Sequence, residues 1–284
     1  MTAPDFILTV QCPDRTGIIA GVSGFLADQD CFITRSRSFG DRSSRRFFLR
    51  LQFSADPDFD KRRFEKGFQK VVSDLDLEWR LYEASAKVRT LIMLSRTDHC
   101  ANALLYGARI GDLPIEPAAI ISNHEQAAAD LAHWRVPVHI VPVTAKTKPQ
   151  AEARMFELKE ACGAELVVLA RYMQVLSEEA CARLAGACIN IHHAFLPGFK
   201  GARPYHRAHE RGVKVIGATA HYVTPDLDEG PIISQVTEPV SHVDEVSDLV
   251  SVGRKLEADA LTRAVKAHAE RRVFLNGAKT VVFP

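Results

Sequence analysis

Segments with the composition of buried strands alternate with helical segments through the later, larger part of the chain. The strand-like segments are residues 88–94, 118–122, 138–141 and 166–169. The helical segments between them are residues 102–108, 125–132 and 149–162. This alternation predicts right-handed βαβ units in a mostly parallel, Rossmann-like α/β sheet. Because ligands of such sheets bind beyond the carboxyl ends of the strands, the loops after Leu169 and Asn190 are the expected place for a site.

The first 84 residues show a different order. Strands and helices are expected there as βαββαβ, at residues 6–11, 18–26, 31–39, 47–53, 59–72 and 77–82. This is the split βαβ arrangement of ferredoxin-like domains. Asp14 stands in the turn after the first strand, where its side chain is expected to cap the first helix. We therefore expect two domains, at residues 1–84 and 88–284, joined by a short polar linker around Ser85.

The last third of the chain continues the larger domain. Two more strands are expected at residues 213–223 and 231–240, and the loop between them carries Asp228. An amphipathic helix is expected at residues 244–272, with apolar side chains such as Leu249, Leu256 and Leu261 facing the core. A terminal hairpin around Asn276-Gly277 follows it.

Composition and charge narrow the class of protein. The chain has 284 residues, of which 46% are hydrophobic, enough for two cores. Its formal net charge of +1 gives no general attraction for nucleic acid or for an anionic membrane surface. No apolar run approaches the length of a membrane span, and no signal-peptide pattern precedes the first strand, so we expect a cytoplasmic protein. Six scattered cysteines without a CxxC pair fit a reducing compartment and argue against structural zinc.

Residues 189–235 contain the groups that carbonyl chemistry needs. Asn190, His192 and Asp228 supply an amide, an imidazole and a carboxylate, which can respectively hold an oxygen, move a proton and orient water. Each has a structural alternative, since Asn190 and Asp228 are common turn residues and His192 could be a buried, hydrogen-bonded histidine. The spacing of His206 and His209 does not match a zinc helix, so we expect no metal.

The first domain resembles the ACT regulatory domain. The resemblance lies in the segment Asp14-Arg15-Thr16-Gly17-Ile18-Ile19-Ala20, which is similar to the first turn and helix of that family. It implies an amino-acid effector bound near Asp14 and Gly17, at an interface between paired copies. It also implies a homodimer or homotetramer. A domain that serves assembly alone is the alternative.

The larger domain resembles the folate-dependent formyltransferase family. The matching segments are residues 170–177, 190–192, 196–197 and 217–231. The resemblance implies that Asn190, His192 and Asp228 are the catalytic trio. It also implies that two loops bind the folate, and the substrate-binding residues in them are Arg171, Met173, Gln174, Val175, Leu176 and Thr224.

Two departures from that family concern the acceptor. Transformylases that use glycinamide ribonucleotide have a glycine-rich phosphate loop after the first strand, whereas residues 95–100 here contain no glycine and include Asp98. His193 stands where those transformylases have proline. A histidine at this position is similar to the deformylase branch of the family. Whether His193 packs, supports the site or takes part in the chemistry stays open. Ala194 replaces an expected serine, which could alter contacts with the substrate.

The resemblance implies hydrolysis of 10-formyltetrahydrofolate to formate and tetrahydrofolate, with water as the nucleophile and no metal or other cofactor. One alternative is formyl transfer to an amine other than glycinamide ribonucleotide. Another is a folate or amino-acid sensor without turnover. The three differ in whether formate appears, and in whether an added amine is needed.

Overall fold

A computed structural model describes residues 4–198 and 204–284. The chain forms two compact units. The first unit extends to Ala86 and includes two later segments, Glu270–Asn276 and Val281–Pro284. The second unit runs from Lys87 to Ala269 and includes Gly277–Thr280. The boundaries expected from the sequence, 1–84 and 88–284, differ from this division because they assign the C-terminal segments to the second unit.

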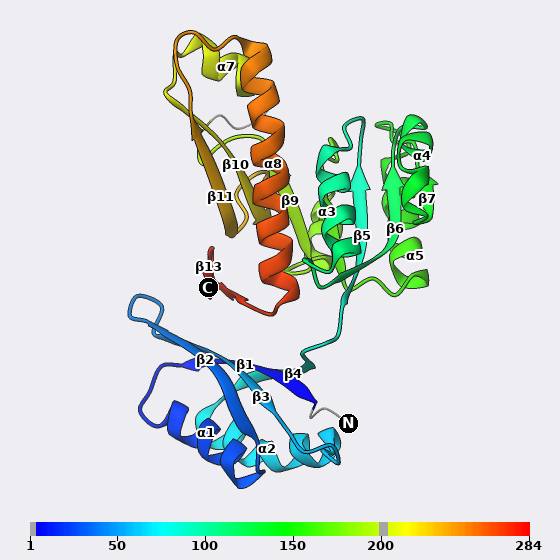
Figure 1. Ribbon diagram of the computed structural model, residues 1–284. Coiled ribbons are helices and arrows are strands. Elements are labelled where there is room, and N and C mark those ends of the chain that lie inside the picture. The colour runs from blue at the N-terminus through cyan, green and yellow to red at the C-terminus, as the bar shows by residue number, and fades with distance from the viewer. Residues whose placement is uncertain (1–3, 199–203) are drawn as a thin grey trace. The chain divides into compact units, whose positions relative to one another are not determined.

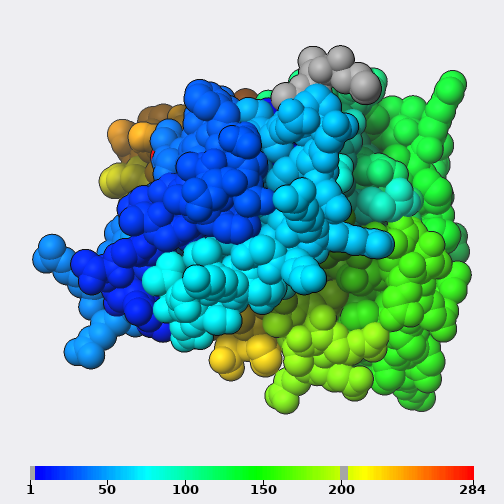
Figure 2. All heavy atoms as spheres, turned by 90° about the horizontal axis from the view of Figure 1, so that it is seen from below, coloured from blue at the N-terminus to red at the C-terminus, as the bar shows by residue number. Residues whose placement is uncertain are grey.

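The first unit is a four-stranded antiparallel sheet with two helices. Its elements follow the order βαββαβ, and the strand order in the sheet is β2-β3-β1-β4. The elements are β1 (Asp5–Pro13), α1 (Ile18–Asp28), β2 (Phe32–Asp41), β3 (Arg46–Ser54), α2 (Lys61–Leu75) and β4 (Glu78–Glu83). Figure 2 shows this unit from the side of its helices, with α1 in blue beside α2 in lighter blue to cyan.

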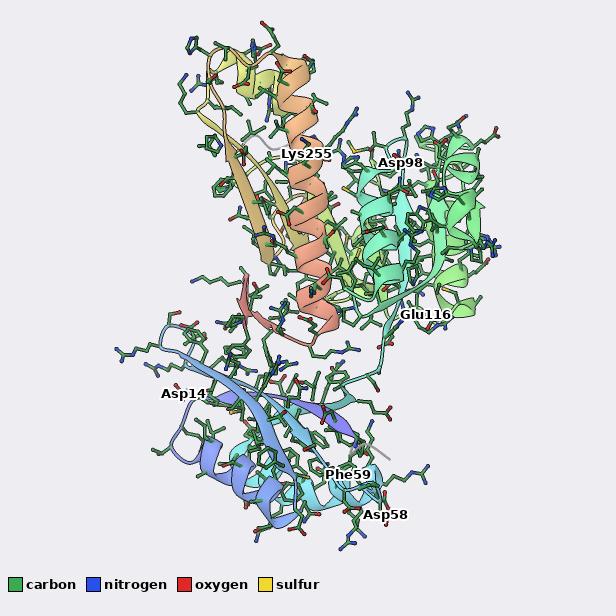
Figure 3. All side chains as sticks on the ribbon, viewed as in Figure 1. Asp14, Asp58, Phe59, Asp98, Glu116 and Lys255 are labelled. Carbon is green, nitrogen blue, oxygen red and sulfur yellow. The ribbon has the colours of Figure 1, made fainter. Side chains whose placement is uncertain are left out.

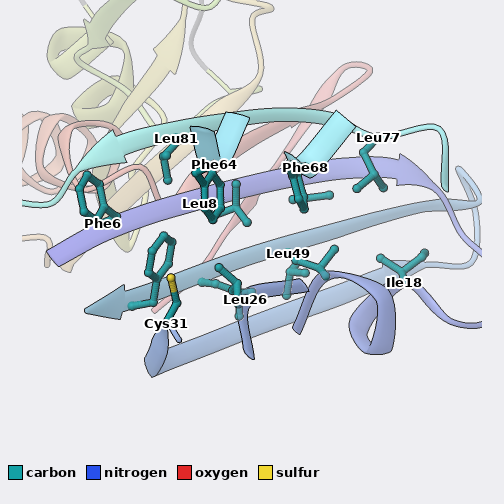
Figure 4. Close-up of a cluster of buried hydrophobic side chains, with 14 of the residues drawn as sticks. Phe6, Leu8, Ile18, Leu26, Cys31, Leu49, Phe64, Phe68, Leu77 and Leu81 are labelled. Atoms are coloured by element: carbon teal, nitrogen blue, oxygen red, sulfur yellow. The ribbon is translucent and has the colours of Figure 1, made fainter. Parts of the chain in front are cut away.

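One face of this sheet packs against both helices. Leu8 on β1 and Leu49 on β3 are fully buried there, together with Leu26 from α1 and Phe64 and Phe68 from α2 (Figure 4). The alternation of inward residues along β1 follows the two-residue period of a strand with one buried face. This apolar layer is the core of the first unit.

The turn before α1 differs from the expectation that Asp14 caps the helix. The N-cap position is Gly17, with φ of 94°, and no side chain caps α1. The expectation was wrong because the chain enters the helix through the left-handed conformation of Gly17, which glycine adopts readily. Asp14 instead donates its backbone N–H to the carbonyl of Arg45, at 2.8 Å, and its carboxylate lies against Gly40.

C-terminal segments cover part of the other face. Phe274 on β12 (Val273–Asn276) lies 5.7 Å from the ring of Phe48, measured between centroids, and Phe283 joins the same cluster. The Arg50 guanidinium donates to the backbone oxygen of Glu270 at 3.0 and 3.2 Å. These contacts explain why the C-terminal segments belong to the first unit. A last strand, β13 (Lys279–Val282), pairs with β12.

The second unit is built on a seven-stranded, mostly parallel sheet in the order β11-β10-β9-β8-β5-β6-β7 (Figure 1). Strands β9, β8, β5, β6 and β7 are parallel to one another. Strand β10 is antiparallel to β9, and β11 is antiparallel to β10. The strands are β5 (Val88–Leu94), β6 (Ile115–Ser122), β7 (Val138–Ile140), β8 (Leu166–Leu169), β9 (Cys188–His192), β10 (Val215–Tyr222) and β11 (Ile232–Pro239). The α helices are α3 (His99–Ile110), α4 (Gln126–Asp130), α5 (Lys148–Ala161), α6 (Glu178–Arg183), α7 (Pro204–Glu210) and α8 (Val246–Ala269), and Ala132–Trp134 forms a 3₁₀ turn.

Helices cover both faces of this sheet. Alternate strand residues such as Leu91 and Val167 pack against Met155 of α5 and Ala180 of α6. Helix α8 contacts β9, β10 and β11, and it also contacts α3. This double cover explains why β8 is fully buried, as its apolar sequence predicts. Within residues 4–198 and 204–284, no helix combines the length and apolar character needed to span a bilayer.

Candidate functional site

A cavity of about 250 Å³ opens where β8 and β9 end. Leu169 pairs with Asn190 in parallel register, so the loops after both strands leave the same edge of the sheet. The cavity is lined by every residue that the sequence assigns to the folate site: Asn190, His192, Asp228, Arg171, Met173, Gln174, Val175, Leu176 and Thr224. His193, whose role the sequence leaves open, lines it too. Asp14 and Gly17 lie in the first unit and do not line it.

Two imidazoles lie beside the Asp228 carboxylate, and Asn190 contacts one of them. Nδ1 of His192 lies 3.2 Å from Oδ1 of Asp228, and their side chains are only 6% and 7% exposed. Nε2 of His221 lies 4.0 Å from the same oxygen. Nδ2 of Asn190 lies 3.3 Å from Nε2 of His221. Asparagine, imidazole and carboxylate therefore form one connected group.

His221 is a member of this group that the sequence did not single out. It stands opposite Asn190 in the antiparallel pairing of β9 with β10. Its Nδ1 donates to the carbonyl of Tyr222 at 2.9 Å, so its Nε2 is free to accept a hydrogen bond from the Asn190 amide. Burial lowers the pKa of His221, which keeps this tautomer neutral. The side chain of Asn190 is thereby oriented.

The charge on Asp228 is held by its neighbours. Burial on its own would raise the pKa of Asp228, but the hydrogen bond and charge of His192 bring that pKa below its usual range. Asp228 is therefore ionised near neutral pH and supports the proton on Nδ1 of His192. Nε2 of His192 is buried and has no hydrogen-bond partner among the described residues, so it remains available to a bound substrate.

The backbone of the β10–β11 loop fixes where Asp228 lies. Asp228 has φ of 59°, a conformation that aspartate tolerates better than most residues. Gly230 follows, and a Cβ there would lie 1.7 Å from the carbonyl oxygen of Tyr222. Only glycine permits this close approach of the loop to the end of β10.

The loop after β8 forms the opposite wall. Ser95 ties it to the end of β5, because its N–H donates to the carbonyl of Arg171 at 3.1 Å and its Oγ accepts from the N–H of Met173 at 2.9 Å. Met173, Val175 and Leu227 line the cavity while more than half exposed. Exposed apolar side chains gathered around a cavity are typical of a ligand site.

A buried carboxylate lies behind this loop. Glu257 of α8 is 1% exposed and accepts from Tyr205 Oη at 2.6 Å. Its Oε2 lies 2.8 Å from Nε2 of His99 and 3.2 Å from Nε of Arg171. Burial would raise the pKa of Glu257, yet the hydrogen bond from His99 and the Arg171 charge keep it below its usual value. The only sequence signal was an acid at helical spacing from inward residues such as Ala260 and Ala264.

His99, Cys100 and Glu257 are close enough to be considered as metal ligands, with ligand atoms within 4.8 Å of one another. One feature opposes a cation there, because the Arg171 guanidinium already lies against Glu257. Without a metal, burial raises the pKa of the Cys100 thiol well above its usual value.

Comparisons with known proteins identify the family of the chain. The Formyl transferase family model matches residues 88–265, within the second unit. A formyltetrahydrofolate deformylase from Corynebacterium sp. (strain P-1) is 48% identical over 279 residues, which cover 97% of each chain. The chain belongs to the formyltetrahydrofolate deformylase family. The likeness to this relative spans both units, whereas the family model matches only the second.

Solved structures separate the two branches. A formyltetrahydrofolate deformylase from Burkholderia mallei covers 99% of this chain and all of its own, with a TM-score of 0.94 and 48% identity. A glycinamide ribonucleotide transformylase from Symbiobacterium toebii covers 72% of this chain and 98% of its own, with a TM-score of 0.67 and 30% identity. The family membership therefore rests on nearly the whole chain.

Proposed function

We propose that this protein hydrolyses 10-formyltetrahydrofolate to formate and tetrahydrofolate. The observation that carries the proposal is the His192–Asp228 pair beside Asn190 at the end of β9, in a cavity with apolar, exposed walls. The names of the family's relatives support the same substrate. No metal or organic cofactor is needed for the steps below.

In the proposed reaction, water adds to the formyl carbon, and the bond from that carbon to the folate nitrogen breaks. Asn190 donates to the formyl oxygen as it gains charge, a contribution typically worth about 3 kcal/mol of barrier. Asp228 holds Nδ1 of His192 in place, orients the water and accepts its proton. His192 passes a proton from Nε2 to the leaving nitrogen. Acid–base help of this kind usually contributes roughly 100- to 10,000-fold.

The two loops around the cavity are proposed to hold the pterin ring. Arg171, Gln174 and Thr224 offer polar contacts, and Met173, Val175 and Leu176 offer an apolar surface for a flat ring. The exposed fractions of Met173 and Val175, 57% and 54%, support this assignment, because a bound ring would cover them.

The loop after β5 argues against a phosphate-bearing acceptor. It contains no glycine, and Asp98 at the start of α3 adds a negative charge (Figure 3). Oδ2 of Asp98 accepts from Asn102 Nδ2 at 2.8 Å, within the first turn of the helix. An anionic phosphate would meet this carboxylate where a transformylase offers backbone amides.

The test is an incubation of purified protein with 10-formyltetrahydrofolate and no amine. We expect formate and tetrahydrofolate to appear in equal amounts. Release that requires an added amine would show formyl transfer instead, and no release under either condition would indicate a sensor.

For the first unit, we infer an ACT-type regulatory domain with an effector amino acid near Asp14 and Gly17. Its βαββαβ order and the left-handed Gly17 at the β1–α1 turn support this inference. Paired ACT-type units would make the protein a homodimer or homotetramer. Titrating the twenty amino acids against the hydrolysis rate tests the effector, and a flat response would leave assembly as the role of the unit.

A further inference from the structure

A second cavity of about 370 Å³ adjoins the proposed folate site. Its lining includes Glu257 and Arg254 of α8. Three residues, Arg171, Met173 and His193, line both cavities. The side chains between the two spaces therefore decide what passes from one to the other.

Arg171 and His193 are joined to each other at this boundary. Nη1 of Arg171 donates to Nδ1 of His193. Arginine has donors only, so Nδ1 must carry the lone pair, and the single ring proton of His193 is on Nε2. Burial, together with the Arg171 charge, lowers the pKa of His193 to about 3, so the ring is neutral. His193 also stacks on His192, with ring centroids 5.1 Å apart.

Glu257 holds the other side of Arg171. Its Oε2 lies 3.2 Å from Arg171 Nε, while Tyr205 and His99 occupy the remaining positions around the carboxylate. Lys255, labelled on α8 in Figure 3, is exposed, and Glu257 two residues later lies on the opposite, buried side of the helix. A buried carboxylate is stable only with such partners, so Glu257 and Arg171 fix each other's position. The hydrolysis proposed above uses Arg171 only as a polar contact for the pterin ring and makes no use of Glu257.

We propose that Glu257 positions Arg171 so that the Arg171–His193 pair forms a partition between the two cavities, and that this partition restricts the nucleophile at the formyl carbon to water. The inference rests on the proposed hydrolysis. A water molecule takes about 30 Å³ of liquid volume, far less than the second cavity, which has room for a small amine. Without the partition, an amine in the second cavity reaches the formyl carbon.

The competing reaction is then formyl transfer. A bond forms between the amine nitrogen and the formyl carbon, the bond from that carbon to the folate nitrogen breaks, and the amine proton ends on the folate nitrogen. The products are a formylated amine and tetrahydrofolate, and no formate is released. The ratio of formylated amine to formate therefore reports the partition directly, whatever the absolute rate.

The experiment titrates hydroxylamine, which is largely unprotonated near neutral pH, into the reaction with 10-formyltetrahydrofolate, with a protein-free blank. The native protein should give formate as its product throughout. Arg171→Ala and His193→Ala should raise the share of formylated hydroxylamine by roughly 10-fold or more, and Glu257→Gln should raise it less. Arg254→Ala is the matched control, because Arg254 lines only the second cavity, and it should keep the native ratio.

Formylated hydroxylamine from the native protein at a rate comparable with hydrolysis would overturn the proposal. So would formate alone from both alanine variants at the highest hydroxylamine concentration. Where a variant has no turnover, imidazole ¹⁵N chemical shifts decide: native His193 should show the Nε2–H tautomer, and Glu257→Gln should disturb it. Unchanged His193 shifts in Glu257→Gln would reject the role of Glu257. A native protein that releases no formate would refute the hydrolysis itself, while the tautomer stays measurable.

Discussion

Oδ1 of Asp228 lies near two imidazoles, 3.2 Å from Nδ1 of His192 and 4.0 Å from Nε2 of His221. His221 is neutral, with its Nδ1 proton given to the Tyr222 carbonyl, so it cannot balance the carboxylate. The ionised Asp228 therefore acts mainly on His192. A substitution that removes the charge of Asp228 but keeps its size therefore tests its role.

Asp228→Asn keeps the size of the side chain and removes its charge. We expect kcat to fall by roughly 100- to 10,000-fold, because His192 loses the carboxylate beside its Nδ1 and the water loses its base. Formate release measures kcat, and calorimetric binding of tetrahydrofolate should persist. Asp259→Asn, which removes an exposed charge ion-paired with Arg263, is the control and should stay active. Full activity of Asp228→Asn would refute its role.

His193 makes a prediction about stability and pH. Its folded pKa of about 3 lies below the ordinary 6.5, so between these values the unfolded chain binds more protons and stability falls as the pH falls. One such group changes the free energy of unfolding by at most about 1.4 kcal/mol per pH unit. His193→Asn should therefore flatten the decline between pH 6.5 and 5. Urea unfolding followed by Trp134 fluorescence, in a Trp79→Phe background, measures it; equal slopes would contradict the prediction.

At the scale of elements, most strands and long helices follow from the sequence, because their apolar residues recur with a clear period. The expected helix at residues 244–272 appears as α8, Val246–Ala269, and the buried strand at 166–169 is present as expected. The short helices α6 and α7 were not expected, since six or seven residues contain too few turns to show a period. The cap at Asp14 failed because backbone conformation, rather than a side chain, begins α1.

Helix α8 makes a prediction whose sign depends on a neighbour. A Cβ at Gly253 would lie 2.1 Å from Oη of Tyr205. In an open helix, replacing glycine by alanine stabilises by about 1 kcal/mol, but here Gly253→Ala should destabilise by about 1–3 kcal/mol through overlap. In a Tyr205→Ala background the same change should stabilise. Urea unfolding of the four proteins tests it, and stabilisation in both backgrounds would show that Tyr205 does not lie against α8.

At the scale of the whole molecule, family resemblance predicted Asn190, His192 and Asp228 as one catalytic trio, and all three line one cavity. The sequence could not reveal His221 or Glu257 as parts of the same region. His221 meets Asn190 through strand pairing across 31 positions, and Glu257 meets Arg171 through the packing of α8. Such meetings depend on tertiary structure, which no local period encodes.

The C-terminal segments predict an effect on the first unit. Phe274 is 7% exposed and packs on Phe48, whereas Leu275 beside it is 43% exposed. Phe274→Ala should lower the free energy of unfolding of this unit by about 3 kcal/mol, and Leu275→Ala should change it by less than about 0.5 kcal/mol. Trp79 fluorescence during urea unfolding, in a Trp134→Phe background, reports the first unit. Equal effects of the two variants would contradict the packing described.

The first unit takes its sheet from residues up to Ala86 and its covering residues from Glu270–Asn276 and Val281–Pro284, and nearly all of the second unit, Lys87–Ala269, is encoded between them. During translation, residues 5–83 leave the ribosome long before Phe274 and Phe283 exist. The second unit thus has nearly all of its residues while the sheet of the first still lacks part of its cover. The unit whose sheet is synthesised first is therefore the one whose folding is completed last.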